Sequence, residues 1–147
     1  MPSNAIPLGI KRDASSKFGV KQVVSERIQT AHKTVYALMG AGLYGMNGIN
    51  PMASMHMIKC FVLPRLLYGL DVIRLTKTDI KNLSTYYVQL LKQIQHVPVR
   101  TATAAVLILA GQIPIEAELH KRMLSLFRNI AENKGSMEYN IAFRQLQ

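Results

Sequence analysis

Cysteine, tryptophan and long apolar runs are scarce in this sequence, and each shortage excludes a class of structure. The 147 residues include one cysteine, Cys60, so no disulfide can form within the chain, and a reducing compartment is the expected environment. The longest apolar run, "AAVLILAG", is much shorter than the roughly 20 residues of a membrane span. The N-terminal residues do not follow the pattern of a signal peptide. We therefore expect an intracellular protein that does not enter a membrane.

Acidic side chains are also few, and the charge imbalance is local. Eighteen Lys and Arg residues face eight Asp and Glu residues, which gives a formal net charge of +10. Residues 1–100 hold thirteen basic and four acidic side chains, whereas residues 101–147 hold five and four. Such a field favours phosphate backbones or anionic lipid, although solvated lysines of a basic soluble protein give the same count. A membrane-surface helix typically carries large interfacial aromatic residues, and the chain has no tryptophan.

The segment "GAGLYG" at residues 40–45 matches the G-x-G-x-x-G pattern of loops that bind a dinucleotide pyrophosphate. That loop requires a strand before it, a helix after it and an acidic residue about 20 positions further on. Here a helical pattern precedes the glycines, "MNGIN" and Pro51 follow them, and Arg65 stands 20 positions beyond Gly45. We therefore interpret the glycines as a flexible connection between helices and expect no NAD site.

Apolar periodicity predicts an all-α, helical bundle-like fold of about five or six helices after a short extended N-terminal piece. Apolar residues at spacings of three and four form the first stripe: Val20, Val24, Ile28, Ala31, Val35 and Leu38. Asn50 and Pro51 are typical of a helix start, and Pro64 should kink or interrupt that helix. Thr76 or Thr78 can cap the next one. The predicted helices span residues 20–39, 51–74, 78–95, 101–110, 114–133 and 137–146.

No pattern in the chain indicates a catalytic or metal site. His56 and Cys60 stand four residues apart, but zinc usually takes four ligands, so we interpret this pair as packing residues. Asp71 and Asp79 stand apart instead of forming a carboxylate pair for two-metal catalysis. We therefore expect no cofactor, and no enzymatic activity from the isolated chain.

Four segments follow one another along residues 6–147: "PLGIKRD", "ERIQTAHKTVYALMGAGLYGMNGINP", "VLPRLLYGLDVIRLTKTDIKNL" and "LLKQIQHVPVRTATAAVLILAGQIPIEAELHKRMLSLFRNI". Their order resembles the C-terminal post-palm region, thumb and linker, of non-LTR (LINE-type) retrotransposon reverse transcriptases. The resemblance implies that residues 1–19 are a remnant of the hairpin that ends the palm. It implies that residues 20–147 are a thumb and linker region, whose first helix lies along the template–primer duplex.

The resemblance also implies what this chain lacks. The parent enzyme is an RNA-directed DNA polymerase, and its Mg ions are held by paired palm aspartates in a Phe/Tyr-x-Asp-Asp motif that is absent here. The chain is then a fragment of a transposable-element protein, nuclear if expressed. Its expected partners are an RNA–DNA template–primer and the missing palm. The alternative is a stand-alone basic helical module that binds nucleic acid or protein without catalysis.

The charge map predicts which side chains contact phosphates. The first expected set surrounds the first helix: Lys11, Arg12, Lys17, Lys21, Arg27 and Lys33. A second set follows later in the chain: Arg65, Arg74, Lys77, Lys81, Lys92 and Arg100. Because phosphate contacts carry no sequence information, we expect binding without sequence preference.

Overall fold

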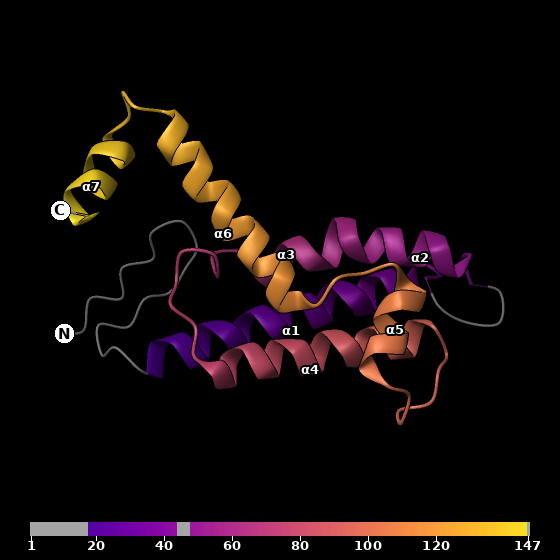
Figure 1. Ribbon diagram of the computed structural model, residues 1–147. Helices are drawn as coiled ribbons and strands as arrows, with labels where there is room; N and C mark the ends of the chain where they lie inside the picture. The colour runs from indigo at the N-terminus through magenta and orange to yellow at the C-terminus, as the bar shows by residue number, and fades with distance from the viewer. Residues whose placement is uncertain (1–17, 44–47, 147) are drawn as a thin grey trace.

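The computed structural model describes residues 18–43 and 48–146, and within these ranges the fold is all-α, as predicted, with no strand. The elements are α1 (Phe18–Gly40), α2 (Pro51–Met57), the π-helical turn η2 (Ile58–Val62), α3 (Leu63–Leu67), α4 (Lys77–Ile94), α5 (Thr103–Ala110), α6 (Ile115–Glu132) and α7 (Met137–Leu146). Helices α1 and α4 lie side by side, and the α2–η2–α3 segment packs on α1 (Figure 1). The last two residues of the predicted 1–19 hairpin segment belong to α1, and the others lie outside the described ranges.

The apolar stripe predicted for α1 is the side that faces the core. Val24, Ala31 and Val35 are buried, and Ile28 is partly buried. The buried side is wider than the predicted stripe, because α3 covers one flank of α1 and α4 covers the other. Val23, outside that stripe, is therefore buried as well.

Pro64 interrupts the α geometry of the second helical segment, as predicted, but the chain stays helical through it. The Leu63 amide donates to the Ile58 carbonyl five residues back, which is the pattern of a π turn. A proline lacks an amide proton and its ring collides with the carbonyl four residues back, so a wider turn accommodates it.

The prediction that this helix reaches residue 74 is wrong, because it ends at Leu67. Tyr68 leaves helical geometry with a ψ of 119°, and Gly69 takes a φ of +73°. Glycine adopts that left-handed conformation without the steric cost that other residues bear. The chain then turns through residues 68–73, with Leu70 fully buried.

The described part of the glycine-rich segment connects two helices, as predicted. Helix α1 ends at Gly40, and Asn50 caps α2 by accepting a hydrogen bond from the Met52 amide at 3.0 Å. The hydroxyl of buried Ser54 donates to the Leu43 carbonyl at 3.1 Å, which anchors the connection to α2. A helix therefore stands where a dinucleotide loop needs a strand, while residues 44–47 lie outside the described ranges.

Helix α4 starts at a reciprocal cap made by Thr76 and Asp79. The Thr76 hydroxyl accepts from the Asp79 amide at 3.3 Å, and the Asp79 carboxylate accepts from the Thr76 amide at 3.1 Å. Thr76, not Thr78, is thus the N-cap residue of α4. Asp79 is buried, and its carboxylate completes the cap.

The core ends within α6. Ile115 and Leu119 at the start of α6 are buried, but Leu124 and Phe127 are 69% and 57% exposed. Figure 1 shows α6 leaving the bundle and α7 lying at its far end, where α7 contacts α6. Over the described ranges, no helix combines the length and the apolar character that a membrane crossing requires.

Candidate nucleic-acid interface

The basic residues of α1 point in three directions. Lys21, Arg27 and Lys33 follow one another at intervals of six residues. At 3.6 residues per turn, that interval places successive side chains about 120° apart around the helix. One flat or gently curved phosphate surface therefore cannot meet all three. Lys11, Arg12 and Lys17, predicted with them, lie outside the described residues.

Two of the predicted phosphate contacts are engaged inside the protein. The Arg27 guanidinium lies over the Tyr68 ring, 4.9 Å from its centroid, and the Arg27 side chain is partly buried. Arg65 Nη1 donates to the Thr34 hydroxyl at 2.9 Å. Both arginines thus join α1 to the α3 segment, a role that their charge alone does not reveal.

Helix α4 gathers its lysines on one face. With about 100° between successive residues, Lys77, Lys81 and Lys92 fall within an arc of about 60°. Lys77 and Lys81 are exposed, and Lys92 is partly buried. The Lys92 ammonium donates to the Val99 carbonyl at 2.6 Å, and this bond holds the loop that carries exposed Arg100 near the same end of α4. We call Lys77, Lys81, Lys92 and Arg100 the α4 basic face.

No carboxylate on α4 opposes this face, because Asp79 is the only acidic residue of the helix and is buried in the cap. Lys77 and Lys92 are fifteen positions apart, which is about 22 Å at a rise of 1.5 Å per residue. Duplex DNA carries one phosphate charge per about 1.7 Å of axis, so several phosphates lie within that length. The α4 basic face can therefore contact more than one phosphate at once.

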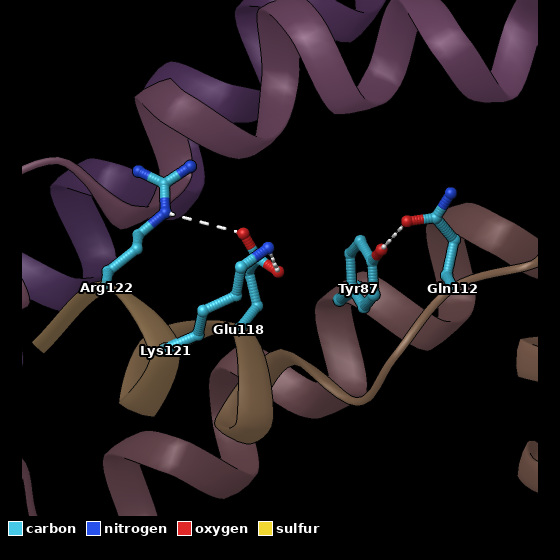
Figure 2. A network of polar contacts seen from close by, with 5 residues as sticks. All are labelled: Tyr87, Gln112, Glu118, Lys121 and Arg122. Carbon is cyan, nitrogen blue, oxygen red and sulfur yellow. Dashed lines mark hydrogen bonds and ion pairs between the residues drawn. The ribbon is translucent and has the colours of Figure 1, made fainter. Parts of the chain in front are cut away.

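The basic residues of α6 are paired with acidic residues of the same helix. The Glu118 carboxylate lies 3.9 Å from Lys121 Nζ and 3.8 Å from Arg122 Nε. Figure 2 draws both contacts. Further along, the Arg128 Nε atom lies 2.6 Å from a Glu132 carboxylate oxygen. Because these side chains are paired, little uncompensated positive charge remains around Lys121, Arg122 and Arg128.

Tyr87 connects this region to the core. Its hydroxyl donates to the Gln112 amide oxygen at 3.4 Å (Figure 2). Burial, and to a smaller extent the charge of Glu118, raises the pKa of Tyr87 to about 12. The phenol is therefore neutral at physiological pH and remains a hydrogen-bond donor.

The structure places His56 and Cys60 on the exposed side of the α2–η2 segment, so the prediction that they pack is wrong. The helical spacing brings the Cys60 Sγ and His56 Nε2 atoms to 3.5 Å, but it turns both toward solvent. In the described ranges, no three His, Cys, Asp or Glu residues come together as a possible metal site.

Comparison of the chain with protein-family models, with curated proteins and with solved structures found no match. The candidate interface rests on the geometry and charge of the α4 basic face.

Proposed function

We propose that this chain is a helical module that binds nucleic acid through its phosphates, without sequence preference and without catalysis of its own. The observation that carries the proposal is the α4 basic face, where Lys77, Lys81 and Lys92 share one side of a helix with no opposing carboxylate. Lysine contacts to phosphate supply affinity and position, but they do not read base sequence.

The resemblance to the post-palm region suggests the biological setting. We propose that the chain is a thumb and linker fragment that holds an RNA–DNA template–primer in the nucleus, beside a palm that carries the magnesium chemistry. A hybrid of A-like form is recognised through shape, 2′-hydroxyls and phosphates, which suits a lysine face. In this proposal α4 supplies the principal contacts, because its lysines share one face, whereas the basic residues of α1 point in three directions.

The test is a salt titration with a fluorescent RNA–DNA hybrid and a DNA duplex of equal length. We compare the wild type with the variant Lys77→Gln/Lys81→Gln/Lys92→Gln. Each phosphate contact contributes about −0.7 to −0.9 to the slope of log affinity against log salt. The triple variant should therefore flatten the slope by about two to three units.

The matched control is Lys121→Gln/Arg122→Gln/Arg128→Gln, which removes the same charge from residues paired with Glu118 and Glu132. It should change the slope by less than about one unit. Circular dichroism verifies that both variants retain their helices. Equal slopes for the two variants would reject the α4 interface, and salt-insensitive binding would reject phosphate recognition.

A protein-interaction module is the second candidate, and the end of the chain favours it. Exposed apolar side chains gather along the second half of α6 and on α7: Leu124, Phe127, Met137, Ile141 and Phe143. Exposed apolar surface of this kind is typical of protein contacts. This candidate replaces the first if the chain self-associates in light scattering and no nucleic acid binds at low salt.

A further inference from the structure

A pocket of about 300 Å³ lies between α1 and α4, at the size where ligand pockets begin. Helix α1 contributes His32 and Tyr36 to its walls, and α4 contributes Tyr86, Gln89 and Gln93. On each helix these residues stand three or four positions apart, so they share one face. The parallel packing of α1 and α4 brings the two faces together and forms the pocket. No part of the α4 basic face lines it.

Three rings form one side of this pocket. The His32 ring centroid lies 4.6 Å from that of Tyr36 and 6.1 Å from that of Tyr86, in edge-on arrangements. Tyr36 is 61% exposed, so much of its surface is free for a stacking partner. Gln89 and Gln93, from the same helix as Tyr86, are exposed, and each amide offers both a donor and an acceptor.

The Tyr86 hydroxyl has no hydrogen-bond partner among the described residues, although it is enclosed by the protein. Burial raises the pKa of Tyr86 to about 12, so the group is protonated at neutral pH and can donate as well as accept. An enclosed polar group without a partner is costly. Tyr86 lines the pocket, so a ligand there that reaches this hydroxyl would remove that cost.

We infer that the pocket receives an unpaired nucleobase of a single-stranded nucleic acid, stacked on Tyr36 and hydrogen-bonded by Gln89, Gln93 and Tyr86. A flat ring with polar edges fits a pocket that combines ring surfaces with amides, and base stacking on aromatic side chains tolerates any base. Lys33 is three residues from Tyr36 and is exposed, so it can meet the phosphate next to the inserted base. The inference deepens the proposed function. Its phosphate contact rests on that function, whereas the pocket for the base does not.

The first test uses adenosine, which carries a nucleobase with its polar edge but has no phosphate. Titration into ¹⁵N-labelled protein, followed by NMR, should shift the side-chain amides of Gln89 and Gln93 and leave that of Gln112 unchanged. Tyr36→Ala should weaken adenosine binding about tenfold, the effect of one lost stacking contact. Tyr86→Phe, which keeps the ring, should weaken it by about three- to tenfold.

The control is Phe61→Ala, which removes an exposed ring from η2, outside the pocket, and should leave adenosine affinity unchanged. Shifts spread over the exposed apolar residues of α6, or equal adenosine affinity in the wild type and Tyr36→Ala, overturn the inference. Circular dichroism shows whether each variant is folded, and Tyr86→Phe supplies a second variant of the same pocket.

The second test compares a 12-nucleotide oligodeoxyadenylate with an abasic oligonucleotide of the same length and charge, at one salt concentration. The base-carrying strand should bind about tenfold more tightly, and Tyr36→Ala should abolish the difference. Equal and measurable affinities overturn the inference while leaving the phosphate interface intact. If neither strand binds, the inference fails even where adenosine binds, and the salt titration with the hybrid and the duplex decides the proposed function separately.

Discussion

The guanidinium carbon of Arg27 lies 4.9 Å from the centroid of the Tyr68 ring, a cation–π contact between α1 and the residue that directly follows α3. Charge alone predicts that Arg27 contacts phosphate, and the structure shows that it also has an aromatic neighbour within the protein. At partly exposed sites such a contact contributes about 0.5–1 kcal/mol.

The Arg27–Tyr68 contact predicts a stability change that charge removal alone would not cause. Arg27→Gln should lower the free energy of unfolding by about 1 kcal/mol, whereas Lys33→Gln on the exposed side of α1 should change it by less than about 0.5 kcal/mol. Urea denaturation measures both. A double-mutant cycle with Tyr68→Ala should give a coupling of about 0.5–1 kcal/mol, and zero coupling would contradict the contact.

The basic residues of α1 should act singly on a duplex. The variant Lys21→Gln/Arg27→Gln/Lys33→Gln should flatten the salt slope by about one unit, because side chains 120° apart cannot share one phosphate surface. The same titration on the α4 variant gives the comparison of two to three units. A loss of two to three units from the α1 variant would show that nucleic acid surrounds α1.

Two neighbouring tyrosines should respond oppositely to loss of their hydroxyls. Tyr86→Phe removes an enclosed hydroxyl without a partner and should raise the free energy of unfolding by up to about 1 kcal/mol. Tyr87→Phe removes the bond to Gln112 and should lower it by about 1 kcal/mol. Urea denaturation of both variants measures the difference, and stabilisation of both or neither would disagree with the assigned hydroxyl contacts.

The same tyrosines predict a loss of stability at high pH. Both pKa values rise from 10 to about 12 in the folded protein, so between these values the folded state holds more protons than the unfolded state. The free energy of unfolding should therefore fall as pH rises from about 10 to about 12. The double variant Tyr86→Phe/Tyr87→Phe should show a shallower decline, and parallel curves would refute the linkage.

Two leucines on α6 locate the edge of the core. Leu119→Ala should lower the free energy of unfolding by about 2–5 kcal/mol, because Leu119 is 2% exposed. Leu124→Ala, one and a half turns further along, should cost less than about 0.5 kcal/mol, because Leu124 is 69% exposed. Chemical denaturation of both variants distinguishes them, and a comparable loss at Leu124 would mean that its surface is covered in solution.

The sequence alone determined the features that depend on neighbours along the chain. The all-α class, the core stripe of α1 and the start of α2 at Pro51 follow from periodicity and capping, because helix hydrogen bonds and caps join residues a few positions apart. The predicted bounds of α7, residues 137–146, agree with the structure for the same reason.

Only the tertiary structure decided which side chains remain available for binding. Arg27 contacts Tyr68, 41 positions away, and Arg65 donates to Thr34, 31 positions away. A pattern of neighbouring residues therefore predicts neither contact. The apolar stripe of α6 continues past Leu119 although the core does not, because burial depends on which helices reach that side. The pocket between α1 and α4 likewise exists only because two segments separated by about 50 residues pack in parallel.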